Sequence, residues 1–208
     1  MRPALKVCGM RDADNIASVA ALAPDYLGFI FYGRSPRYVG EMPSETLRKV
    51  PSSICKVGVF VDSAPEYIRE TVDRYGLDMV QLHGGESLRL CREIRKMCPV
   101  IKAFRVRQPA DLRSVVKYAG VCDFFLFDTP ADGFGGSGRQ FDWSVLSDFE
   151  SPLPFFLSGG IGPGDADRIG LFGHPALAAV DVNSRFETAP GVKDVALLAE
   201  FIRKMNSK

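Results

Sequence analysis

Two residues of opposite acid–base character end short apolar runs of the sequence. Cys8 ends the run 5–8, and Asp128 ends the run 124–128. A thiolate can remove a proton and a protonated carboxyl can supply one, so these residue types could do acid–base chemistry. The alternatives are a buried small side chain for Cys8 and a loop-capping aspartate for Asp128. A thiol with a pKa near 8.5 is only about 3% ionised at pH 7, so we expect a nearby cation, and Arg11 is a candidate. The aromatic run before Asp128 favours its protonated form.

Three more polar side chains follow or end apolar runs. Arg37 comes after Ser35-Pro36, His83 ends the run 79–83, and Asp181 lies near the end of the run 178–182. An arginine fork suits a carboxylate ligand. A histidine and an aspartate can bind hydroxyl groups or orient their neighbours. A surface salt bridge for Arg37, and purely structural roles for the other two, are the alternatives.

A glycine-rich stretch after one run predicts an anion site. Gly159 and Gly160 belong to the sequence SGGIGP at 158–163, and Asn183 and Ser184 follow the last apolar run. Glycines allow backbone N–H groups to approach an anion, and a helix beginning there adds its dipole. Alone, a Gly-Gly turn is more often a tight loop. Its pairing with Asn183-Ser184 favours a phosphate site.

The elements that must position these groups alternate along the chain. Eight β-rich runs are nearly continuously hydrophobic, as expected of parallel strands covered by helices. Helical patterns lie between them. The strands are expected at 5–8, 26–31, 55–61, 79–83, 100–106, 124–128, 154–158 and 178–182, and the helices at 13–22, 44–49, 64–75, 87–97, 109–118, 143–149, 164–171 and 195–205.

This α/β pattern predicts one (β/α)8 TIM barrel with eight parallel strands over residues 1–208. An open doubly wound sheet uses the same alternation but normally has five to seven strands, and it stays the alternative fold. In a barrel, the polar residues above would ring the mouth formed by the carboxyl ends of the strands.

Composition excludes several classes of function. Lysine and arginine total 26 against 25 acidic residues, which provides no basic field for nucleic acid or a membrane surface. The five cysteines show no paired metal or redox spacing, and the sequence has neither a signal peptide nor a membrane span. We expect a cytoplasmic protein that binds a small molecule, needs no metal or other cofactor, and is a monomer rather than a dimer.

A series of motifs resembles phosphoribosylanthranilate isomerase across nearly the whole chain. The motifs are KVCGM (6–10), GFIFY (28–32), SPRYV (35–39), VGVFV (57–61), VQLHG (80–84), KAFRV (102–106), FDT (127–129), GGSG (135–138), FDW (141–143), SGGI (158–161), DVNS (181–184) and PGVKD (190–194). The chain departs from the family pattern at Arg11, where threonine is common, and at Arg185, where glycine is common.

The resemblance implies an Amadori rearrangement in tryptophan biosynthesis, in which an aminoaldose phosphate becomes an aminoketose. It implies that Cys8 is the general base, Asp128 the general acid and Arg37 the partner of the anthranilate carboxylate. A mobile active-site loop is expected at 135–138. A related aminoaldose isomerase of histidine biosynthesis uses two carboxylates, and a barrel that has lost catalysis is the non-enzymatic alternative. Metal-dependent epimerases need several histidines, whereas this chain has two.

Overall fold

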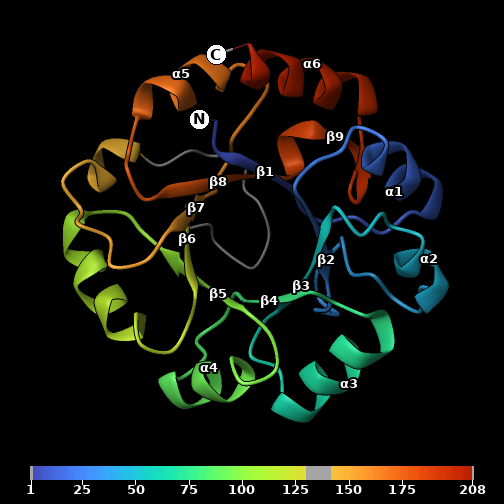
Figure 1. Ribbon diagram of the computed structural model, residues 1–208, viewed down its shortest axis with the longest axis horizontal. Helices are drawn as coiled ribbons and strands as arrows, with labels where there is room; N and C mark the ends of the chain where they lie inside the picture. The colour runs from blue at the N-terminus through green and yellow to red at the C-terminus, as the bar shows by residue number, and fades with distance from the viewer. Residues whose placement is uncertain (1, 130–141, 208) are drawn as a thin grey trace.

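Eight parallel strands close into a barrel surrounded by helices in the computed structural model, which describes residues 2–129 and 142–207 (Figure 1). Each strand pairs with its sequence neighbours, and β1 pairs with β8 to close the ring. The strands are β1 (Ala4–Val7), β2 (Tyr26–Ile30), β3 (Cys55–Phe60), β4 (Met79–Leu82), β5 (Val100–Arg105), β6 (Phe124–Asp128), β7 (Phe155–Leu157) and β8 (Leu177–Val182). The predicted barrel is therefore confirmed, and each strand limit lies within one residue of its predicted position.

The outer ring contains α-helices and two 3-10 helices. The α-helices are α1 (Ala13–Ala20), α2 (Ser44–Arg48), α3 (Pro65–Tyr75), α4 (Leu88–Ile94), α5 (Ala166–Phe172) and α6 (Val195–Asn206). Pro65 occupies the first turn of α3, and Gly76 ends that helix with a left-handed backbone at φ 59°. Asp194 accepts a hydrogen bond from the Leu197 N–H and caps α6.

Two predicted helices have a tighter winding than expected. The segments are 3-10 helices, η1 (Pro109–Tyr118) and η2 (Trp143–Leu146). In η1 the Ser114 hydroxyl donates to the Asp111 carbonyl three residues back, so the side chain competes with α-helical bonding. Both segments still cover the barrel, because Leu112 and Trp143 are buried.

Two apolar cores hold the fold together. The larger lies between the strands and the surrounding helices, and the smaller fills one end of the barrel interior with side chains that include Val57, Ile101, Leu126 and Phe156. Because successive residues of a strand face opposite sides, each strand contributes to both. The opposite end of the interior is polar.

The chain adds a short hairpin after the last barrel strand, which the sequence did not predict. The 3-10 turn η3 (Ser184–Phe186) leads into β9 (Glu187–Ala189), which pairs antiparallel with β10 (Val192–Lys193). Asn15 of α1 fixes the hairpin, because its amide donates to the Lys193 carbonyl at 2.9 Å and accepts from the Lys193 N–H at 2.7 Å.

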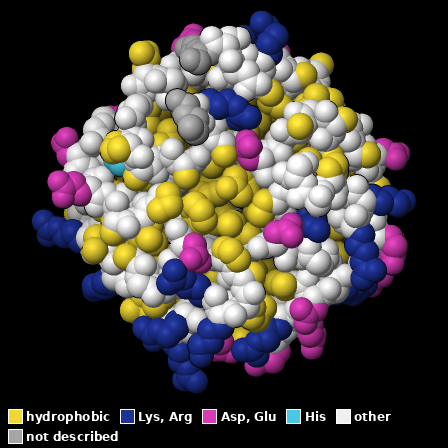
Figure 2. Space-filling model, in the orientation of Figure 1, with side chains coloured by type: hydrophobic (Ala, Val, Ile, Leu, Met, Phe, Trp, Pro, Cys, Tyr) yellow, Lys and Arg dark blue, Asp and Glu magenta, His cyan; other side chains and the backbone are white. Residues whose placement is uncertain are grey.

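The surface mixes both signs of charge. Figure 2 shows hydrophobic side chains gathered over the middle of the barrel, with acidic and basic side chains interspersed around the rim. No helix in the described part of the chain is long and apolar enough to cross a membrane.

Candidate active site

Cys8 lies directly after β1, at the carboxyl end of the barrel, and is 4% exposed. Its N–H donates to the Val182 carbonyl at 2.9 Å, which fixes it against the end of β8. Burial raises the pKa of the Cys8 thiol, although Lys6 and Lys193 oppose that effect by attraction. The resting group is therefore a thiol, whereas the sequence led us to expect cations strong enough to lower its pKa.

The cation beside Cys8 is Lys6, and Arg11 lies elsewhere. Lys6 Nζ and Cys8 Sγ both lie beside Gly28, at 3.1 and 2.8 Å from where its Cβ would be, whereas Arg11 is exposed and donates to the Pro36 carbonyl at 2.9 Å. The role suggested for Arg11 was wrong, because its side chain turns away along the surface. A lysine two residues before Cys8 must face the same side of the strand, and this alternation was the signal that sequence reasoning missed.

Asp181 joins Lys6 in a buried network. The Lys6 ammonium lies 2.9 Å from Asp181 Oδ1, and the Ser158 hydroxyl donates to Asp181 Oδ2 at 3.2 Å. Lys6 and Asp181 are 0% and 6% exposed. Burial alone would lower the pKa of Lys6, but the charge of Asp181 and the contact with Cys8 raise it, so Lys6 stays protonated.

Asp128 and His83 form a second group, on the other side of the mouth. His83 Nε2 lies 3.3 Å from Asp128 Oδ2, and both side chains are about a quarter exposed, at 22% and 24%. The Gln81 amide nitrogen lies 2.7 Å from His83 Nδ1, an arrangement in which the amide donates and Nε2 carries the ring proton. The Thr129 N–H donates to Asp128 Oδ1 at 2.8 Å. The Asp128 carboxyl group is therefore accessible to a substrate, and its contacts with His83 and the Thr129 N–H fix its position.

Arg37 is buried in an ion pair with a residue of the C-terminal hairpin. Its Nε and Nη2 atoms donate to the Glu187 carboxylate at 2.7–3.0 Å, and Arg37 is 7% exposed. Lys193 Nζ lies 2.6 Å from Glu187 Oε1 and 2.7 Å from Asn183 Oδ1. Two cations thus share one carboxylate, which leaves a net positive charge beside the mouth.

The excess of positive charge among Arg37, Lys193 and Glu187 affects the pKa values of these groups. Burial alone would raise the pKa of Glu187, but hydrogen bonds from Arg37 and the charge of Lys193 lower it below its usual range. Burial lowers the pKa of Lys193, and Arg37 adds repulsion that Glu187 does not fully offset. Glu187 therefore stays ionised, and Arg37 keeps Nη1 free of that carboxylate.

The glycine-rich turn after β7 has the backbone expected of an anion cradle. Gly159 and Gly160 have φ values of 90° and 71°, in the left-handed region that favours glycine. Asn183 and Ser184 stand beside that turn, because β7 and β8 are neighbours in the barrel. The side chain of Arg185 passes over Gly162, with Nε 3.4 Å from where a Cβ would lie.

Gly9, next to Cys8 in the sequence, is the point where Arg37 and Asn183 come together. A Cβ at Gly9 would lie 2.7 Å from both Arg37 Cδ and Asn183 Oδ1. The absence of a side chain therefore lets residues from the ends of β1, β2 and β8 converge. All nine predicted site residues lie at this end of the barrel.

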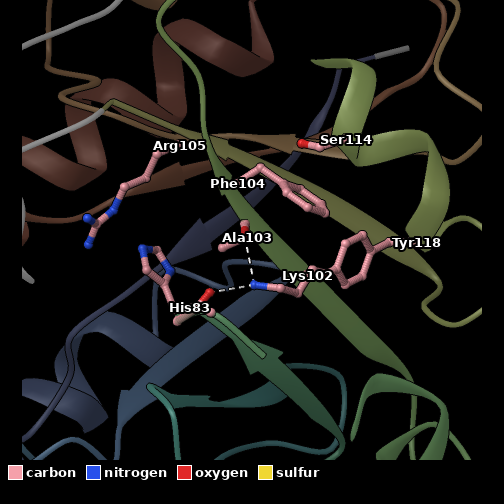
Figure 3. A pocket seen from close by; sticks show the side chains of 9 residues that line it. His83, Lys102, Ala103, Phe104, Arg105, Ser114 and Tyr118 are labelled. Atoms are coloured by element: carbon pink, nitrogen blue, oxygen red, sulfur yellow. Dashed lines mark hydrogen bonds between the residues drawn. The ribbon is translucent and has the colours of Figure 1, made fainter. Parts of the chain in front are cut away.

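A cavity of about 400 Å³ opens beside His83, lined by residues of the β4 and β5 ends and of η1 (Figure 3). Figure 3 shows Arg105 and His83 on one side of it and the rings of Phe104 and Tyr118 on the other. Lys102 is satisfied by the carbonyls of Leu82, Gly84 and Ala103 and by Glu86.

The described residues contain no cluster of three His, Cys, Asp or Glu side chains that could hold a metal ion. The expected loop at 135–138 lies outside the described residues.

A family model for N-(5′-phosphoribosyl)anthranilate isomerase matches residues 5–204. The chain belongs to this family. The N-(5′-phosphoribosyl)anthranilate isomerase of Parabacteroides distasonis is 45% identical over 204 residues, which is 97% of this chain and 92% of that protein.

Solved structures of phosphoribosylanthranilate isomerases have the same fold. The crystal structure from Thermotoga maritima has a TM-score of 0.87 and 33% identity, and it covers 99% of this chain and 100% of that one. A second, in complex with reduced 1-(o-carboxyphenylamino)-1-deoxyribulose 5-phosphate, has a TM-score of 0.87 and 31% identity with the same coverage. The isomerase family expected from the motifs is confirmed.

Proposed function

We propose that the chain catalyses the Amadori rearrangement of N-(5-phosphoribosyl)anthranilate to 1-(2-carboxyphenylamino)-1-deoxyribulose 5-phosphate in tryptophan biosynthesis, with Cys8 and Asp128 exchanging the protons. The family match over residues 5–204 supports the reaction. The observation that best supports the roles is the placement of a thiol on one side of the mouth and a carboxyl group on the other, with the charge of Lys6 acting on the thiol.

The proton transfers balance across the two residues. Protonated Asp128 donates to the ring oxygen, and the ring opens to a Schiff base. Cys8 as thiolate takes the C2′ proton, which gives an enolamine and leaves Cys8 as a thiol. The enolamine gains a proton at C1′ and loses the one on the C2′ hydroxyl, and solvent returns Cys8 and Asp128 to their starting forms.

Arg37 binds the anthranilate carboxylate in this proposal. Because Nε and Nη2 are engaged by Glu187, the hydrogen bonds to substrate come from Nη1 and from the second proton of Nη2. The net positive charge of the Arg37, Glu187 and Lys193 cluster suits an anion at this place.

The phosphate is held beside the carboxyl ends of the neighbouring strands β7 and β8. The backbone N–H groups of Gly159, Gly160, Asn183 and Ser184 form the cradle, and Arg185 adds a guanidinium where the family commonly has glycine. His83 and Asp181 contact the sugar hydroxyls.

Substitution of the two proton-transfer residues tests the proposal. Cys8→Ala and Asp128→Asn should each lower turnover by about 10²- to 10⁴-fold, followed by the fluorescence decay of the substrate. The double variant should lose much less than the product of the single effects, because the residues act as a unit. Cys55→Ala, a cysteine at the amino end of β3, serves as the matched thiol control and should keep full turnover.

Near-normal turnover of Cys8→Ala would show that another group is the base. No turnover by the unmodified protein would favour the non-catalytic barrel, and turnover of the histidine-pathway aminoaldose alone would favour that rival.

We infer in addition that the 208 residues act as one barrel domain and as a monomer in the cytoplasm. All five cysteines are free, which supports a reducing compartment. Light scattering of the eluting protein tests the monomer, and a mass of twice 22.8 kDa would contradict it.

A further inference from the structure

Lys6 is a buried cation that the proton transfers above do not use. It is 0% exposed, and its ammonium group lies inside the barrel below the mouth. A buried charge persists only when it is paired, and Asp181 meets that requirement at 2.9 Å. The second neighbour is the less expected one, because the ammonium charge also acts on the Cys8 thiol and favours its thiolate form.

The space around this contact is kept clear by Gly28 on the neighbouring strand. A Cβ at Gly28 would lie 2.8 Å from Cys8 Sγ and 3.1 Å from Lys6 Nζ. Both atoms therefore lie next to the same residue of β2, Gly28. Any side chain there would force the sulfur and the ammonium group to move.

We propose that Lys6 is a positioning residue for the isomerase reaction, holding the Cys8 sulfur at the mouth and providing a positive charge that Cys8 shares with Asp181. The inference rests on the proposed role of Cys8 as the base. It assigns a second purpose to Asp181, whose negative charge limits how strongly Lys6 attracts a thiolate.

The charges around Cys8 come from three elements. Lys6 on β1 and Lys193 on β10 favour the thiolate, whereas Asp181 on β8 disfavours it, and Arg37 contributes a further charge close to Gly9. Lys6 exerts the largest attraction, and Asp181 the next charge effect, of opposite sign. Removal of one or the other should therefore change the Cys8 pKa in opposite directions, which a purely structural pair would not do.

Thiolate absorbance at 240 nm, titrated against pH, measures this directly. Each variant is paired with its own Cys8→Ser derivative, so that the other four cysteines and the tyrosines cancel in the difference. Lys6→Met should raise the pKa of Cys8 by about 1–3, and Asp181→Asn should lower it, since charges at this range have effects of that size. The acidic limb of the turnover–pH profile should move with the titration in both variants.

Two further variants serve as controls for this experiment. If Lys6→Met does not fold because Asp181 is left unpaired, the double variant Lys6→Met with Asp181→Asn buries no charge, and its Cys8 pKa should exceed that of Asp181→Asn alone. Lys102→Met removes an equally buried lysine that pairs with Glu86, and it should leave the Cys8 titration unchanged.

An unchanged Cys8 titration in the Lys6 variants, or movement in the same direction on loss of Lys6 and of Asp181, would overturn the inference. The base assignment fails separately, through an active Cys8→Ala variant.

Discussion

Glu187→Gln should destabilise the fold strongly, because Glu187 is the carboxylate that pairs with both Arg37 and Lys193. Its side chain is 5% exposed and accepts from Arg37 at 2.7–3.0 Å, from Lys193 at 2.6 Å and from the Gly191 N–H at 3.1 Å. A glutamine is nearly isosteric, but its NH2 group would face donors, and two cations would lose their counter-charge.

Removal of one partner from a buried ion pair costs about 3–5 kcal/mol. For a chain of this size, each kcal/mol shifts the Tm by about 2–4 °C, so the expected loss is about 6–20 °C. Arg37→Met should cost less, about 1.5–3 kcal/mol, because Glu187 keeps Lys193 and the Gly191 N–H. The Michaelis constant should rise in both variants, since Arg37 loses its orientation in one and its charge in the other.

Urea and thermal unfolding at pH 7 measure the two losses. Glu200→Gln provides the matched control, because Glu200 pairs with Lys204 on the surface of α6 and its loss should leave the Tm unchanged.

The pH dependence adds a test of sign. The pKa of Glu187 is lowered in the folded protein, so its contribution is present above the unfolded pKa and is lost as pH falls through the folded one. The difference in the free energy of unfolding between wild type and Glu187→Gln should therefore become smaller below about pH 4. The reasoning is refuted if Glu187→Gln melts within about 2 °C of wild type, or if Arg37→Met is the less stable variant.

Two other outcomes are expected. Turnover should keep rising with pH beyond about 8.5, the ordinary thiol pKa, because burial raises the pKa of Cys8 and the base acts as the thiolate; a profile that is flat from pH 6 would contradict this. Gly159→Ala should weaken competition by inorganic phosphate at least 10-fold, because φ is 90° and a Cβ would collide with Thr129; unchanged competition would place the phosphate elsewhere.

The fold could be predicted because the signals for it are local. Each parallel strand is a short run buried on both faces, and each such run reads as hydrophobic without knowledge of its neighbours. The 3-10 winding of η1 was not predicted because the hydrogen bond of Ser114 to Asp111 competes with α-helical winding in a segment whose apolar spacing is helical. The β9–β10 hairpin was not predicted because its strands, of three and two residues, are too short to show an alternating pattern.

The site could be predicted only in part, because its pairings are distant along the chain. The position of Cys8 at a strand end indicates a place at the mouth, but Lys6 finds its partner 175 residues later. Arg37 is paired with Glu187 at a separation of 150 residues, so the sequence could not distinguish a free arginine from a tethered one. Charge alone could not decide between Arg11 and Lys6 either, because strand alternation determines which cation faces Cys8.

The bond of Asn15 to Lys193 has a consequence for the order in which the enzyme becomes competent. Lys193 is anchored by α1 and reaches Glu187 and Asn183, while Cys8 is held by the end of β8. A stretch of chain that stops short of Glu187 lacks both the carboxylate that accepts from Arg37 and the lysine that shares this carboxylate. During synthesis the Arg37 cluster therefore assembles late, across a separation of 150 residues, and contacts between distant segments form more slowly than local ones.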